Sequence, residues 1–156
     1  MNKQKIIFFS LTLLVMLTSC GYQVINKFIQ NSYSVNKIKI TGDKRIGYVI
    51  KNEILLNSSE NASNEINVEL NVNKKKETKE KNISNKITKF TILLNVTLSF
   101  KNNENSEITK TFNKSVDYDV VTNHSDTLSN EKNSVRILTD QIANDIVKFL
   151  NFYFIN

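Results

Sequence analysis

The segment from Phe90 to Phe100 constrains the fold of this chain more than any other part of the sequence. Apolar residues occupy every second position, as Phe90, Ile92, Leu94, Val96, Leu98 and Phe100. Successive side chains of a β-strand point to opposite faces of the sheet, so this alternation predicts a long strand with one apolar face. Such a face has to be buried against a second layer, and the chain must supply elements that cover it.

Three further segments predict strands because their apolar residues alternate with polar ones. They are residues 33–40, residues 66–73 and, after a polar turn at 102–105, residues 108–120. Between the second strand and the long one lies a charged stretch, residues 74–81, which contains no apolar residue.

Two segments show helical spacing. Asp43 is a good N-cap for a helix over residues 44–57, in which Ile46, Ile50 and Ile54 recur at steps of four. The polar residues 122–134 predict a loop. After it, a closing helix is predicted by apolar residues at steps of three and four, namely Val135, Leu138, Ile142, Ile146 and Phe149.

The resulting order, β-α-β-β-β-α, predicts an α+β fold. We expect a two-layer sandwich in which a mostly antiparallel four-stranded sheet packs against two helices, because this arrangement buries both sets of apolar residues. The length and the absence of a linker favour a single domain over residues 33–156.

Residues 1–19 have the parts of a bacterial lipoprotein signal peptide. Lys3 and Lys5 are followed by the apolar run Ile6–Met16 and then by Leu17-Thr18-Ser19-Cys20. The run is too short for a spanning helix, which needs roughly 20 apolar residues. We therefore predict cleavage before Cys20, S-diacylglycerol and N-acyl chains on Cys20, and a lipidated tether over residues 20–32. The alternatives are an ordinary signal peptide with a chance cysteine, or a buried free thiol.

The residue types available exclude several kinds of chemistry. Cys20 is the only cysteine and His124 the only histidine, so we expect no internal disulfide, no metal site and no cysteine–histidine nucleophile pair. Asp117 and Asp119 share the solvent side of one strand, which argues against an acid–base pair. Ser125 and Asp126 directly follow His124, and consecutive residues rarely converge as a triad. We expect no catalysis and no cofactor.

The chain resembles the LPS-assembly lipoproteins of Gram-negative outer membranes, the LptE family. The resemblance rests on the opening Cys20-Gly21-Tyr22 and on the first strand, followed by Gly42-Asp43 and a helix. It rests also on the strand that ends at Tyr118-Asp119-Val120 before a polar loop and a closing amphipathic helix. It covers most of the mature domain.

The resemblance implies a lipoprotein of the outer membrane that plugs the lumen of the LptD β-barrel and helps this barrel to assemble. It also implies binding of lipopolysaccharide and help with its insertion into the outer leaflet. Gly21, rather than an aspartate that would favour the inner membrane, is consistent with this location. The alternative is a non-catalytic lipoprotein adaptor of another envelope machine, such as outer-membrane barrel assembly.

The net positive charge of the chain favours acidic partners. Loss of residues 1–19 removes Lys3 and Lys5, so the formal charge falls by two, from +6 to +4. We predict that the phosphates of lipopolysaccharide meet the basic residues of the charged stretch, Lys74, Lys75, Lys76, Lys79 and Lys81. The alternative is a solvated hairpin tip, in which Glu77 and Glu80 partly cancel the charge. We expect no nucleic-acid partner. The aromatic tail, residues 149–154, packs on the sheet or contacts a partner, and the sequence leaves both open.

Overall fold

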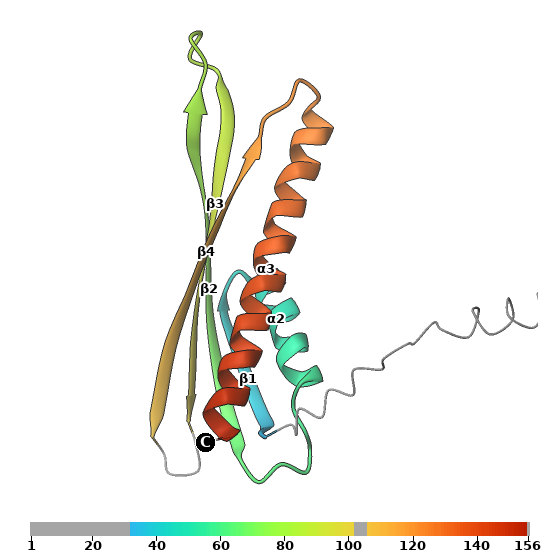
Figure 1. Ribbon diagram of the computed structural model, residues 1–156, viewed down its shortest axis with the longest axis vertical. Coiled ribbons are helices and arrows are strands. Elements are labelled where there is room, and N and C mark those ends of the chain that lie inside the picture. The colour runs from blue at the N-terminus through green and yellow to red at the C-terminus, as the bar shows by residue number, and fades with distance from the viewer. Residues whose placement is uncertain (1–31, 102–105, 156) are drawn as a thin grey trace, which may run out of the picture.

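A mixed four-stranded sheet with two helices forms the protein, in the predicted order β-α-β-β-β-α (Figure 1). The computed structural model describes residues 32–101 and 106–155. The predicted signal peptide, Cys20, most of the tether and the turn at 102–105 lie outside these ranges. The elements are β1 (Ser34–Gly42), α2 (Lys44–Leu56), β2 (Glu65–Lys81), β3 (Ile87–Lys101), β4 (Glu107–Asp119) and α3 (His124–Ile155).

The strands lie side by side in chain order. β2 pairs antiparallel with β3 and β3 with β4, whereas β1 pairs parallel with β2, with Ile40 opposite Leu70. Parallel neighbours need a crossover connection, which α2 provides. Both helices cover the same face of the sheet and contact each other (Figure 1).

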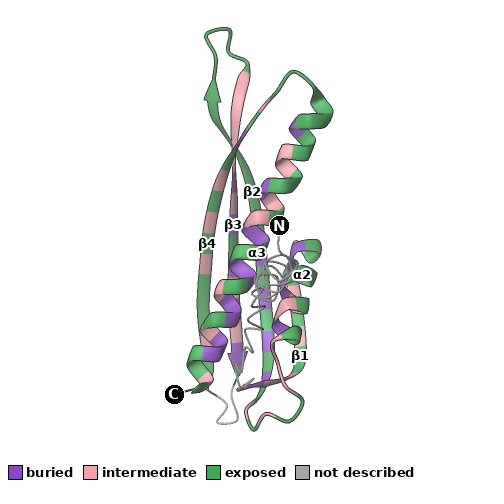
Figure 2. Cartoon of the chain, turned by 45° about the vertical axis from the view of Figure 1, so that its right-hand side comes forward, coloured by how far each residue is buried: buried purple, intermediate pink, exposed green. Residues whose placement is uncertain are grey.

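The core lies between the sheet and these helices, and the buried residues follow the predicted periods (Figure 2). Every second side chain is buried from Ile66 to Val72 in β2 and from Ile92 to Phe100 in β3, and Leu70, Ile92 and Leu98 are at most 1% exposed. They share one core with Ile46, Ile50 and Ile54 of α2 and with Leu138, Ile142 and Ile146 of α3. The opposite face of the sheet carries mainly small polar side chains, including Asn71, Asn73, Asn95, Thr97, Ser99, Thr109, Thr111 and Asn113.

Local signals predicted α2 well. The helix ends one residue earlier than expected, and the side chain of Asp43 caps it. Asp43 Oδ1 accepts hydrogen bonds from the amides of Arg45 (3.1 Å) and Ile46 (3.2 Å). These bonds satisfy two of the amides that the first turn of a helix leaves without an intrahelical partner.

The charged stretch is part of β2 and not a hairpin tip. β2 was predicted to end near Asn73, but it stays paired with β3 as far as Lys81 opposite Ile87. Backbone pairing with an apolar-rich neighbour keeps the strand extended while its charged side chains remain at the surface. The tip is the turn at residues 82–86, where Asn85 adopts a positive φ of 61°.

The prediction of a loop over residues 122–134 was wrong, because α3 begins at His124. The Asn123 side chain accepts a hydrogen bond from the Ser125 amide (3.1 Å). Small polar residues, Thr127 and Ser134, face inward at 8% and 7% exposure. A search for apolar periodicity misses a helix face made of such residues.

The aromatic tail is the last part of α3, and it packs on the sheet. Phe154 lies against Tyr33 and Phe100, with ring centroids 5.9 and 5.6 Å apart. Phe149 lies against Phe100 and Phe112. Within the described ranges neither helix is long and apolar enough to cross a membrane.

Candidate functional site

The five lysines of the charged stretch do not form one patch. Side chains alternate along β2, so Lys74 and Lys76 lie on the face covered by the helices, whereas Lys75 lies on the open face. Lys79 also lies on the open face, where it reaches Asp117 of β4. Lys81 ends the strand beside the turn.

Four of these lysines have acidic partners. Lys74 lies 3.8 Å from Asp43, Lys75 lies 3.6 Å from Glu77, and Lys76 lies 2.6 Å from Glu131. Lys79 pairs with Asp117. In the described part of the chain only Lys81, among the five, forms no ion pair. These pairs neutralise most of the positive charge locally, and the contact of this stretch with lipopolysaccharide stays a prediction.

Lys76 belongs to a cluster that joins α3 to the sheet. Glu131 Oε2 accepts hydrogen bonds from Lys76 Nζ (2.6 Å) and from the Tyr118 hydroxyl (2.9 Å). Lys76 Nζ also lies 4.2 Å from the centre of the Phe90 ring, a cation–π contact. Partial burial acts to lower the pKa of Lys76, but the hydrogen bonds and charge interactions with Glu131 and Tyr118 together outweigh it, and the pKa is raised. The same bond lowers the pKa of Glu131, so both groups are charged at neutral pH.

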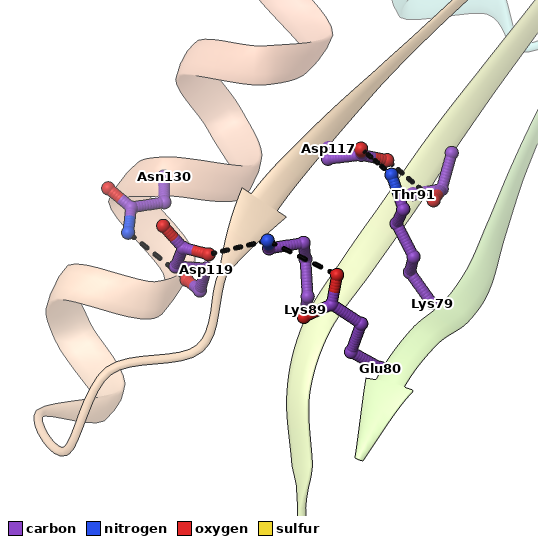
Figure 3. A network of polar contacts seen from close by, with 7 residues as sticks. All are labelled: Lys79, Glu80, Lys89, Thr91, Asp117, Asp119 and Asn130. Atoms are coloured by element: carbon purple, nitrogen blue, oxygen red, sulfur yellow. Dashed lines mark hydrogen bonds and ion pairs between the residues drawn. The ribbon is translucent and has the colours of Figure 1, made fainter. Parts of the chain in front are cut away.

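Asp117 and Asp119 of β4 lie on the solvent side, as predicted, and each is paired with a lysine (Figure 3). Asp117 accepts hydrogen bonds from Lys79 and from the Thr91 hydroxyl, and these bonds lower its pKa. Asp119 lies 3.7 Å from Lys89, which also pairs with Glu80. Their charges are balanced by neighbours, which suits a structural role better than proton transfer.

A cleft lies between the first turn of α2, the middle of β2 and α3. It has a volume of about 550 Å³. Of the predicted lysines, only Lys74 lines it. The other lining residues are Asp43, Lys44, Arg45 and Ile46 from the start of α2, and Leu128, Glu131, Lys132 and Val135 from α3.

A second hollow of about 200 Å³ shares four residues with this cleft, so the two form one groove between the helices, the α2–α3 groove. It adds Val49, Arg136, Thr139 and Asp140 to the lining. The lining of the groove therefore contains five cationic side chains and three carboxylates. Arg136 is paired with Asp140 at 3.3 Å, Lys74 with Asp43, and Glu131 with Lys76.

Three cations of the groove form no ion pair with any described residue: Lys44, Arg45 and Lys132. Beside them lie the apolar side chains of Ile46, Val49 and Val135. Positive charge next to an apolar surface suits an amphiphilic anion, with its phosphate on the cations and its hydrocarbon on the apolar side chains. Sequence reasoning missed the groove because its residues come from three distant segments.

Metal chemistry finds no support in the residues that the structure describes. Within 32–101 and 106–155, no group of three or more histidine, cysteine, aspartate and glutamate side chains is placed to hold an ion. His124, Ser125 and Asp126 lie in the first turn of α3, where consecutive side chains point in different directions.

The sequence matches no family model and no curated protein. The fold, however, is similar to those of solved bacterial lipoproteins. Rare lipoprotein B from Shewanella oneidensis has a TM-score of 0.55 at 8% identity, over 78% of this chain and 98% of that one. A minor lipoprotein from Acinetobacter baumannii has a TM-score of 0.60 at 14% identity, over 78% and 92%. A lipoprotein from Caulobacter crescentus has 0.55 at 15%, over 80% and 91%. The shared property is the fold.

Proposed function

We propose that this chain is an outer-membrane lipoprotein, lipidated on Cys20, which plugs an LptD-like β-barrel and helps it assemble and pass lipopolysaccharide to the outer leaflet. The observation that carries the proposal is the fold shared with rare lipoprotein B over nearly the whole length of that protein. The lipoprotein signal predicted over residues 1–20 independently supports the lipid attachment.

The open face of the sheet suits a place inside a barrel. The interiors of outer-membrane barrels are polar, and this face is rich in asparagine, serine and threonine. Its hydroxyls already pair across the strands, Thr97 with Thr111 (3.2 Å) and Ser99 with Thr109 (2.9 Å). Such side chains both donate and accept, so they match a polar lumen without burying an uncompensated charge.

The α2–α3 groove suits lipopolysaccharide, which carries phosphates next to acyl chains. Lys44, Arg45 and Lys132 supply positive charge that no described carboxylate neutralises, and Ile46, Val49 and Val135 supply the apolar contact. We therefore propose this groove, in preference to the charged stretch of β2, as the site that contacts lipopolysaccharide.

The partner is tested by affinity purification of the full-length, tagged protein from detergent-solubilised envelopes, beside the Cys20→Ala variant. A large β-barrel as the dominant partner of both forms would support the proposal, because the plug contact does not need the lipid. Co-purification of only other periplasmic or barrel-assembly factors would favour the alternative of an adaptor for another envelope machine.

The groove is tested with matched triple variants in a lipopolysaccharide pull-down at physiological salt. Replacing Lys44, Arg45 and Lys132 by glutamine should weaken binding by at least about tenfold, because hydrogen bonds to charged groups contribute about 1.5–3 kcal/mol each. Replacing Lys75, Lys81 and Lys86 by glutamine removes the same charge outside the groove, and we expect a small effect. Equal losses would mean that binding follows net charge alone, and a larger loss in the second variant would return the site to β2.

A further inference from the structure

Large apolar side chains are exposed where both helices end. At the end of α2, Leu55 is 40% and Leu56 78% exposed; at the end of α3, Tyr153 is 37% and Ile155 65% exposed. Tyr48 and Val49, 56% and 49% exposed, precede Leu55 and Leu56 by seven residues each. Seven residues are about two helical turns, so these side chains continue the apolar surface along α2.

The first described residues, Ser32 and Tyr33, lie at the same end of the molecule. The carbonyl of Ser32 accepts a hydrogen bond from the Asn64 side chain (2.9 Å), and the carbonyl of Tyr33 accepts one from the Ser59 amide (3.0 Å). A hollow of about 500 Å³ brings Ser32, Ser59 and Ile155 together. In Figure 1 the C-terminal ends of α2 and α3 both lie at the lower end, beside the start of β1. We call this region the anchor end, defined by Ser32, Leu55, Leu56, Tyr153 and Ile155.

We propose that the anchor end lies against the lipid surface of the membrane that holds the acyl chains, which rests on the lipidation of Cys20 proposed above. Twelve residue steps separate Cys20 from Ser32 (32 − 20). A fully extended segment of this length spans at most about 40 Å, so lipidation keeps the anchor end close to the bilayer. The length of the segment limits the distance, and the exposed apolar side chains select the orientation.

The chemistry of the anchor end fits the boundary between headgroups and acyl chains. Aliphatic side chains and a tyrosine are typical of segments that lie in this boundary. Beside them the hollow is lined by hydroxyl and amide side chains, Ser32, Ser59, Asn61 and Asn64, which suit the polar headgroups. The connecting residues 57–64 contain a single charged residue, Glu60.

This orientation keeps the tip of the β2–β3 hairpin out of the lipid. β2 has 17 residues, and at about 3.3 Å per residue its far end lies roughly 50 Å from the anchor end. The turn beyond it carries Ile83, which is fully exposed. Leu56 and Ile155 should therefore meet lipid, whereas Ile83 should not.

The absence of tryptophan from the sequence allows a direct test. The full-length variants Leu56→Trp, Ile155→Trp and Ile83→Trp are produced, and each mature lipoprotein is purified from envelopes and reconstituted into phosphatidylcholine vesicles. Fluorescence is compared between vesicles with brominated and with ordinary acyl chains. All three positions are exposed, so circular dichroism should show an unchanged fold, and the two anchor-end probes come from different helices.

We expect bromine to remove at least roughly half of the fluorescence of Leu56→Trp and Ile155→Trp, since interfacial side chains lie about 5–10 Å below the headgroup boundary. Ile83→Trp should keep its fluorescence. Equal quenching of all three, or none at the anchor end, would overturn the inference. If the protein floats with the vesicles but its anchor-end probes are unquenched, lipidation stands and only the inference fails. If it does not float, the proposed attachment falls and the inference falls with it.

Discussion

Replacing Gly42 by alanine should disrupt the junction of β1, β2 and α2. Gly42 has a φ of +81°, in the left-handed region that favours glycine. An added Cβ would lie 2.0 Å from the carbonyl oxygen of Val72 and 2.9 Å from its carbonyl carbon. Both atoms belong to the backbone of β2, which is paired with β1 on one side and β3 on the other. β2 therefore cannot move away without breaking a ladder.

The expected loss of stability has two parts. The left-handed conformation costs an alanine about 1–2 kcal/mol, and steric overlap in a packed region typically costs about 1–3 kcal/mol. Together they predict a decrease of about 2–5 kcal/mol in the free energy of unfolding. For a domain of this size each kcal/mol lowers Tm by about 3–6 °C, so the melting temperature should fall by roughly 6–30 °C.

The assay is urea and thermal unfolding followed by circular dichroism, with Gly47→Ala as the matched control. At Gly47 in α2, the three atoms nearest to the added Cβ all belong to the Ile40 side chain, the closest at 2.4 Å. Ile40 is only partly buried, so its side chain can shift more easily than the paired backbone at Val72, and alanine is favoured over glycine by about 1 kcal/mol in a helix interior. We expect a much smaller loss there. The reasoning is refuted if Gly42→Ala stays within about 1 kcal/mol of the wild type or costs no more than the control.

Three further predictions concern the ion-pair cluster, the helix cap and the core. Glu131→Gln should lower the free energy of unfolding by about 1 kcal/mol at neutral pH, because it removes the ion pair with Lys76 from a half-exposed site. The lowered pKa of Glu131 makes this contribution complete above the ordinary glutamate value, about 4.3, and lost as the pH falls through the folded value. A difference from the wild type that persists unchanged in urea titrations at pH 3 would contradict this. Asp43→Ala should cost about 1 kcal/mol by removing the N-cap of α2, and unaltered urea unfolding would argue against the capping role. Ile142→Ala, at a position with no exposure, should cost about 2–5 kcal/mol, and a smaller loss would mean that the core collapses around the cavity.

Local sequence patterns predicted the elements that depend on local physics. The alternation along β3, the helical spacing of Ile46, Ile50 and Ile54, and the cap at Asp43 all reappear in the structure. The apolar period and the helix cap depend on residues that are near in sequence, so both can be recognised without knowledge of the partner element. For the same reason the prediction that Asp117 and Asp119 share a solvent-facing side was correct.

Tertiary pairing decided what these patterns do not encode. The charged end of β2 is a strand because β3 supplies its backbone partners, and the first turns of α3 are helical although their inward residues are polar. Pairing also divided the lysines between two faces and gave most of them acidic partners from β4, α2 and α3.

By itself, therefore, the sequence determined the order of elements and the apolar faces, and it predicts a lipoprotein signal that ends at Cys20. Only the tertiary structure determined that Lys44, Arg45 and Lys132 line one groove, and that both helices end beside the start of β1. The physical reason is the separation, along the sequence, of the residues that have to interact. A strand or helix face follows from residues two to four positions apart, whereas a groove or a shared end depends on segments that meet only after the core has been buried.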